Sequence, residues 1–238
     1  MNTKKLEKLI ADCLDDFYER RLNIINTLNL KKYLKRKNPY LYKAIGTEKA
    51  SDIVEEILRA YLISSDETIF GDAFFEPIAK MASGGVVSPA EGVDIGIETR
   101  KKYLAVSVKS GPNWGNSSQK RKQEDDFRAL RKRLYKIHKE YDPMIGHCYG
   151  KKSSETSRTK ISRDRSGQIF WEEITGDSDF YLKLIRLMKD KPQKHRIKYK
   201  KAWNSAVNLF TKEFIDEFCK KNGSINWEKL VRFNSGKD

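Results

Sequence analysis

The stretch from Glu91 to Gly111, EGVDIGIETRKKYLAVSVKSG, constrains the fold more than any other part of the sequence. Residues Val93–Glu98 alternate in strand fashion, Thr99–Lys102 form a polar segment typical of a turn, and Tyr103–Val108 are rich in residues that favour β-structure. The pattern therefore predicts a β-hairpin.

Two ionisable side chains lie on this hairpin. Asp94 belongs to the first strand and Lys109 ends the second. Because successive strand side chains point to opposite faces, Ser107 and Lys109 share one face, while Val106 and Val108 point into a core. A charged Lys at the end of an apolar strand is costly to bury without an anion beside it. Either Asp94 or a phosphate group would supply that anion.

An Asp on one strand, followed by a Lys that ends the next strand, resembles the core of the PD-(D/E)XK nucleases. The text GVDIGIE…YLAVSVKSGPNWGNSSQ is similar to the type II restriction endonucleases of that superfamily. The resemblance covers roughly Glu67–Tyr181, and its specific part is Gly92–Gln119. Val93 replaces the Pro of the pattern, and Ser107 replaces the Asp or Glu, which removes an expected metal ligand.

The resemblance implies an α/β (α+β) fold with a central mixed sheet flanked by helices, a helical N-terminal region and a C-terminal helix. It also implies a type II site-specific deoxyribonuclease that cleaves double-stranded DNA by Mg²⁺-dependent hydrolysis. Such enzymes usually act as homodimers on palindromes, beside a cognate DNA methyltransferase. One alternative is a structure-specific or repair nuclease of the same superfamily, and another is a non-enzymatic basic nucleic-acid-binding protein.

In the implied site, Asp94 binds Mg²⁺ together with the Val108 carbonyl and either Glu124 or Glu76. Lys109 then lies against the phosphate and the attacking water, as a charge stabiliser or proton acceptor. Some superfamily members with Ser at the position of Ser107 recruit a glutamate from the following helix.

Glu124 is the first candidate for that glutamate. Ser117–Tyr141 reads as a helix, and Glu124 lies three residues before the first member of its apolar stripe. The alternative is an acid in the first helical turn, favoured by the helix macrodipole. The stripe consists of Phe127, Leu130, Leu134 and Ile137.

Glu76 is the second candidate. The segment SSDETIFGDAFFEPIAK begins with capping-box spacing at Ser64 and Glu67, which predicts a helix start. Glu76 then shares a helix face with Ile69. Superfamily nucleases often carry a glutamate on the helix before the first catalytic strand. The alternative is a surface Glu before a helix-kinking Pro77.

The loop SGPNWGNSSQ directly follows Lys109 and is rich in turn formers and hydrogen-bonding side chains. Such side chains bind phosphate oxygens or read base edges, although we expect the tryptophan mainly to anchor the loop. The candidate DNA contacts here are Ser110, Asn113, Trp114, Asn116, Ser117, Ser118 and Gln119.

A second basic segment, Lys151–Gln168, is nearly devoid of apolar residues and reads as a loop or extended ribbon. It either enters a DNA groove or is a surface loop without a partner. Its candidate DNA contacts are Lys151, Lys152, Arg158, Lys160, Arg163 and Arg165.

Charge and cysteine usage limit the class of protein. The net charge of +15 predicts attraction to a polyanion, with nucleic acid first. Cys13, Cys148 and Cys219 lie far apart and form no CxxC pair, which fits a reducing cytoplasm. No 18-residue apolar run is present, and the N-terminus lacks the features of a signal peptide, so we expect a cytoplasmic protein without a membrane span.

We expect three parts within one compact domain: residues 1–63 as a helical region, 64–190 as the nuclease core, and 191–238 as a helical extension. The segment DKPQKHRIKYKK reads as a basic linker or a phosphate-contacting arm. We expect His147 to be packed within its strand. The other predicted elements are helices over 4–30, 47–62 and 202–220 and strands over 86–87 and 144–149.

Overall fold

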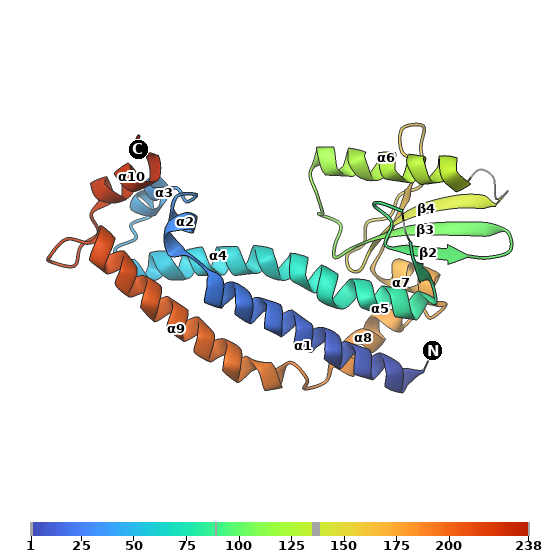
Figure 1. Cartoon of the computed structure of the whole chain (residues 1–238), viewed down its shortest axis with the longest axis horizontal. Coiled ribbons are helices and arrows are strands. Elements are labelled where there is room, and N and C mark those ends of the chain that lie inside the picture. The colour runs from blue at the N-terminus through green and yellow to red at the C-terminus, as the bar shows by residue number, and fades with distance from the viewer. Residues whose placement is uncertain (1, 89, 135–138, 238) are drawn as a thin grey trace. The chain divides into compact units, whose positions relative to one another are not determined.

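The computed structural model describes residues 2–88, 90–134 and 139–237 (Figure 1). Their contacts define two compact units. The sheet unit contains Met1–Phe17 and Thr68–Pro192, and the helical unit contains Tyr18–Glu67 and Gln193–Asp238. The helical unit thus joins most of the expected N-terminal region to the expected C-terminal extension.

A mixed sheet of five strands, in the order β1-β2-β3-β4-β5, forms the centre of the described sheet unit. β1, β2 and β3 pair antiparallel, and β3, β4 and β5 pair parallel. The predicted hairpin is confirmed, with Ile95 opposite Val106. The strands are β1 (Val86–Val87), β2 (Ile95–Glu98), β3 (Lys102–Lys109), β4 (Glu140–His147) and β5 (Arg163–Ser166).

Helices cover both faces of this sheet (Figure 1). Because strand side chains alternate, Val106 packs into a core with side chains of α1 (Thr3–Thr27), α5 (Glu76–Ser83), α7 (Gly167–Thr175) and α8 (Phe180–Met188). On the other face, Ala105 and Ile145 pack against Phe127 and Leu130 of α6 (Ser117–Leu134). The stripe position Ile137 lies outside the described residues.

The helical unit has its own apolar core, to which α4 and α9 contribute Ile53, Ile57, Phe210, Phe214 and Phe218. Two of its short helices begin at asparagines whose side chains accept hydrogen bonds from backbone N–H groups of the first turn. Besides the second part of α1, the unit contains α2 (Leu30–Leu34), α3 (Pro39–Ala44), most of α4 (Ala50–Phe70), α9 (Gln193–Phe218) and α10 (Trp227–Ser235).

The helix start predicted at Ser64 is wrong, because α4 continues through it to Phe70. Leu62 and Ile69, seven residues apart, are both buried on one helix face, and this packing overrides the local capping pattern. A π-helical segment, η1 (Gly71–Phe75), then joins α4 to α5, with Pro77 in the first turn of α5.

Two segments predicted as irregular are regular. Arg163–Ser166, expected within a loop, forms β5, since ion pairs and the parallel ladder with β4 replace the missing apolar burial. The expected linker around Gln193–Lys201 is the first part of α9.

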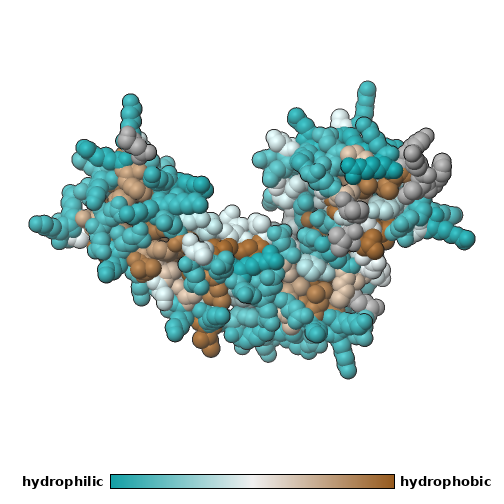
Figure 2. Space-filling model, viewed as in Figure 1, coloured by the Kyte–Doolittle hydropathy of each residue, from teal (hydrophilic) through white to brown (hydrophobic). Residues whose placement is uncertain are grey.

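The face seen in Figure 2 is largely hydrophilic, as expected for a chain with 34% charged residues. Among the described helices, none has the length and apolarity to cross a membrane. All three cysteines are free thiols.

Candidate active site

Asp94 lies directly before β2 and beside Ser107 of β3. Its backbone N–H donates to the Val106 carbonyl oxygen at 2.9 Å, which extends the hairpin ladder. Its Oδ2 accepts a hydrogen bond from the Val108 N–H at 2.7 Å and lies 3.5 Å from the Ser107 hydroxyl oxygen. Burial raises the pKa of Asp94, and the bond from Val108 opposes that rise. The carboxylate is therefore held rigidly by the backbone of the neighbouring strand.

The same pKa is sensitive to three further charges, which places them around this carboxylate. The charges of Lys109 and Lys80 lower the pKa of Asp94, and the charge of Glu76 raises it. Glu76 binds Lys80 one helical turn later, at 2.6 Å. The Lys109 Nζ lies 4.8 Å from the centre of the Trp114 ring. The carboxylate of Asp94 thus lies within electrostatic reach of Lys109, Lys80 and Glu76.

The π-helical segment sets the position of Glu76. Gly71, its first residue, lies so close to β3 that an added Cβ would stand 2.6 Å from the Ser110 Oγ. The extra residue in a π-turn shifts the following helix face, and such segments are frequent at functional sites. The absence of a side chain at Gly71 lets α5, with Glu76 in its first turn, approach the end of β3.

Gln123, which the sequence analysis missed, occupies the place expected for Glu124. The buried Ser107 hydroxyl donates to the Gln123 Oε1 at 2.9 Å, and the Gln123 Nε2 donates to the Gly92 carbonyl at 2.6 Å. An amide therefore bridges the two segments that flank Asp94. The signal in the sequence is a spacing of four residues, one helical turn, between Gln123 and the buried Phe127.

Glu124 faces a different segment. Its Oε2 accepts hydrogen bonds from the N–H groups of Ile161 at 2.8 Å and Ser162 at 3.4 Å, and its Oε1 accepts one from the Ser162 hydroxyl. Glu124 thus stabilises the position of Ile161 and Ser162, the two residues directly before β5. The alternative of an acid in the first helical turn is wrong, because α6 begins at Ser117, about two turns before Glu124. The role of Glu124 as a metal ligand stays a prediction.

The loop after Lys109 is fixed by caps as well as by packing. The Asn116 N–H donates to the Gln119 Oε1 at 2.8 Å, and the Gln119 N–H donates to the Asn116 Oδ1 at 3.0 Å. This reciprocal pair caps α6. Trp114 packs, partly buried, against the cluster under α6, as expected for an anchor. Of the other candidates, Asn113, Ser117 and Ser118 are exposed.

Arg163 is not available for a DNA contact. It is buried and pairs with Asp142 at 2.7 Å and with Glu173. Burial opposes the charged forms, but these bonds raise the pKa of Arg163 and lower the pKa of Asp142. Arg165 likewise pairs with Glu155 at 2.7 Å.

A buried carboxylate, Asp164, organises the rest of this segment. It accepts bonds from Lys160 at 2.7 Å and Ser154 at 2.8 Å, and Lys152 lies 3.5 Å away. His147 is fully buried, with its Nε2 3.5 Å from Asp164, so the expectation of a packed histidine is confirmed. Lys151 and Arg158 are exposed.

A cavity of about 340 Å³ opens beside α6, next to Trp114. Its two acids, Glu124 and Asp164, are already held by hydrogen bonds. An excess of cations over acids makes the cavity suitable for anionic groups such as phosphates. Its basic lining residues are Lys120, Arg121, Arg128, Lys152 and Lys160.

A mixed sheet flanked by helices, with a carboxylate and a lysine at adjacent strand ends, defines a nuclease core of the restriction-endonuclease type. The family model of the type II restriction endonuclease EcoO109I matches residues 4–196, and the chain belongs to this family. It is therefore a site-specific DNA nuclease. A search of curated proteins finds no match.

Proposed function

We propose that this protein cleaves double-stranded DNA at a specific sequence by Mg²⁺-dependent phosphodiester hydrolysis, as a homodimer with a cognate methyltransferase. The observation that carries the proposal is the geometry of the hairpin, which sets Asp94 beside Ser107 and Val108, directly before Lys109. Glu76 comes from a different element, and its charge acts on the same carboxylate.

The donor chemistry of the site fits Mg²⁺. Among the described residues, no cluster of three His, Cys, Asp or Glu side chains could hold a metal ion. Mg²⁺ needs fewer protein ligands, since it keeps several waters and binds one or two carboxylates. Asp94, Glu76 and the Val108 carbonyl offer hard oxygen donors, and Glu124 is committed to Ile161 and Ser162. When bound, the ion would acidify a water and neutralise phosphate charge.

Lys109 stabilises negative charge on the phosphate or accepts a proton from the attacking water. The ring of Trp114 holds its ammonium group from one side through a cation–π contact. The Val108 N–H holds Asp94 in place, so both charged groups are ordered before DNA arrives.

The DNA backbone would approach over the loop after Lys109 and the basic cavity beside α6. Ser110, Asn113, Ser117 and Ser118 border the first, and Lys152 and Lys160 line the second. Lys151 and Arg158 extend this basic surface, while Asn116 and Gln119 act first as helix caps.

The test is a Mg²⁺-dependent digest of plasmid and phage DNA with sequenced ends. Discrete bands are expected from the wild type, and Lys109→Ala should lower the cleavage rate by at least about 10²-fold, the usual size of such a catalytic contribution. Lys101→Ala, in the exposed hairpin turn, is the control and should cut normally. Cleavage by Lys109→Ala at the wild-type rate would refute the site.

The same digest separates the alternatives. Smeared products or cutting only at junctions would indicate a structure-specific or repair nuclease, and binding without metal-dependent turnover would indicate a non-enzymatic protein. Two further variants test the metal ligands. Glu76→Gln should lose cleavage, whereas Glu124→Gln should keep it and lose about 1–3 kcal/mol of stability, because the part-buried donors of Ile161 and Ser162 lose a charged acceptor.

A further inference from the structure

The first part of α9 carries a dense group of cations, far in sequence from the hairpin. The basic segment of α9 comprises Lys194, Arg196, Lys198, Lys200 and Lys201, all exposed. Because an α-helix has 3.6 residues per turn, Lys194, Lys198 and Lys201 lie on one side of it and Arg196 and Lys200 on the other. No Asp or Glu occurs in α9 before Glu213. With 21 Lys and Arg against 12 Asp and Glu, the helical unit has a net charge of +9, more than half of the total +15.

This arrangement opposes the stability of the helix itself. The N-terminus of a helix carries partial positive charge and favours acids, yet the first turn of α9 has none. Arg196 and Lys200 are four residues apart and Lys198 and Lys201 three, and like charges at those spacings repel. An anion bound to the basic segment would offset this repulsion.

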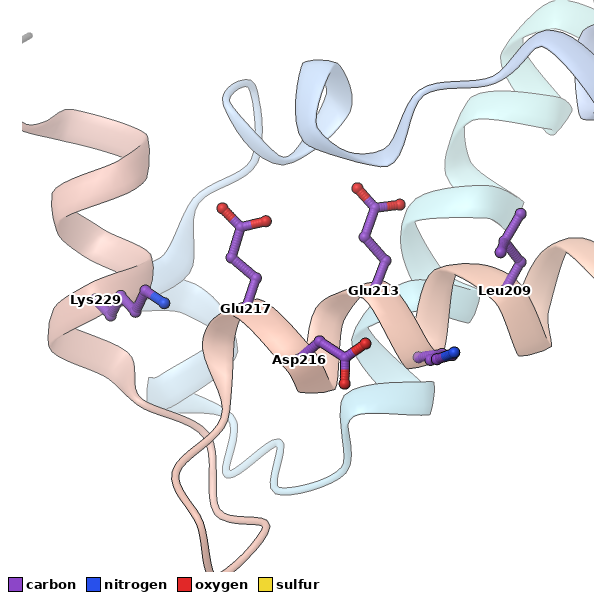
Figure 3. Close-up of a pocket in the computed structure, with 6 residues that line it drawn as sticks. Leu209, Glu213, Asp216, Glu217 and Lys229 are labelled. Atoms are coloured by element: carbon purple, nitrogen blue, oxygen red, sulfur yellow. The ribbon is translucent and has the colours of Figure 1, made fainter.

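The other end of α9 shows the opposite charge. Glu213, Asp216 and Glu217 follow one another along the helix, with Lys229 of α10 nearby (Figure 3). Acids at a helix C-terminus are also unfavourable. The acids at this end are partly balanced, because Lys212 precedes Glu213 and Lys31 pairs with Glu217, whereas the first part of α9 contains five cations and no Asp or Glu.

A cleft within the helical unit lies on each of the two sides of the basic segment. One, of about 370 Å³, is lined by Arg196 and Lys200 and also by Arg59, whose guanidinium carbon lies 5.2 Å from the centre of the Trp203 ring. The single acid lining it, Asp66, forms a bidentate ion pair with Arg21. The other, of about 530 Å³, is lined by Lys198 and Lys201.

We propose that the basic segment of α9 is a second DNA-contact surface, which binds the phosphate backbone without reading sequence. Exposed cations at this density suit phosphates, because each neutralised phosphate releases counterions. The choice of double-stranded DNA as the partner rests on the proposed function. The surface itself rests on the charges and clefts of the helical unit.

The test compares binding of a duplex of about 30 base pairs in EDTA, where no cleavage occurs, by fluorescence anisotropy at several salt concentrations. The full-length triple variant Lys198→Gln, Lys200→Gln, Lys201→Gln should bind at least about tenfold more weakly at 0.1 M salt. The slope of log affinity against log salt should fall by about 2–3, at about 0.9 per lost phosphate contact.

The matched control is Lys220→Gln, Lys221→Gln, Lys229→Gln, three exposed lysines of the same unit with the same change in net charge. It should keep most of the wild-type slope. The triple variant of α9 should unfold at or above the melting temperature of the wild type, since it removes repulsion between like charges on the helix. Its weaker binding would therefore not reflect unfolding. Equal losses in both variants, no loss in either, or a loss only towards anionic vesicles would overturn the proposal. The binding experiment measures no cleavage. If Lys109→Ala cleaved DNA at the wild-type rate, the proposed active site would be refuted, but the proposed DNA contact by α9 would still be tested independently.

Discussion

Ser107 determines the charge balance around Asp94. An acid at this position would add a second negative charge beside a carboxylate whose pKa burial already raises. The Ser107 hydroxyl instead donates a hydrogen bond to the Gln123 Oε1, and the Gln123 Nε2 donates to the Gly92 carbonyl. A neutral bridge thus joins the two segments at this position, and the charge of Glu76 also raises the pKa of Asp94.

That bridge leads to the first prediction. Gln123→Ala should remove the 2.9 Å acceptor of the buried Ser107 hydroxyl and the side-chain donor to the Gly92 carbonyl, at about 1–3 kcal/mol of stability. The two segments that flank Asp94 would lose the amide that joins them, so the turnover rate on saturating DNA should also fall, by about tenfold or more. Thermal melting and cleavage assays measure both effects. Gln168→Ala, which loses an exposed bond to Ser178, is the control. Wild-type turnover by Gln123→Ala would show that the bridge does not position Asp94.

The second prediction concerns acid stability. Burial opposes ionisation of Asp164, but bonds from His147, Lys160 and Ser154 lower its pKa below the ordinary 3.8. A depressed folded-state pKa stabilises the protein above the ordinary value, and this stability is lost as the pH falls through the folded-state pKa. The free energy of unfolding should therefore decline below about pH 4, and less steeply for Asp164→Asn. Denaturant titrations between pH 6 and pH 2 measure this. Parallel curves for the two proteins would contradict the assignment.

At the scale of elements, the sequence predicts what local periodicity determines. The hairpin, α6 and the β-β-α-β order follow from alternation and helical stripes. What it cannot predict depends on partners that are distant in sequence. The strand β5 is stabilised by the ion pairs of Arg163 with Asp142 and Glu173. Helix α4 continues through Ser64 because of its tertiary packing. The residues of the candidate site also fall into a group that the sequence predicts and a group that it does not. Asp94 and Lys109 are found from the hairpin, whereas Gln123 in place of Glu124 depends on the rotation of α6.

The third prediction tests the π-helical segment. Alanine in place of glycine usually stabilises a helix by about 1 kcal/mol. Gly71→Ala should instead destabilise the protein and slow cleavage, because the new Cβ would lie 2.6 Å from the Ser110 Oγ, so that the Ser110 side chain must rotate or η1 must shift away from β3. Gly71→Ala with Ser110→Ala should recover much of the lost stability, since the Ser110 Cβ is 3.8 Å away. Because Ser110 borders the proposed DNA path, cleavage by the double variant is compared with cleavage by Ser110→Ala alone. Melting and cleavage of the two single variants and the double variant measure the coupling. Strictly additive effects would rule out the contact.

At the scale of the whole molecule, each chain carries one Asp94–Lys109 pair. Cutting both DNA strands therefore requires either two chains or two successive binding and cleavage events by one chain. We expect a two-fold homodimer on palindromic DNA, with each site assigned to one strand. Chains with Lys109→Ala should therefore form mixed dimers with the wild type that cut one strand only. With the inactive chain in about tenfold excess, and after co-refolding so that chains exchange, supercoiled plasmid should yield mainly nicked circles. Lys101→Ala chains in the same excess are the control and should yield linear DNA. A monomer that visits twice would give linear DNA in both mixtures, at a rate reduced only in proportion to the active chains.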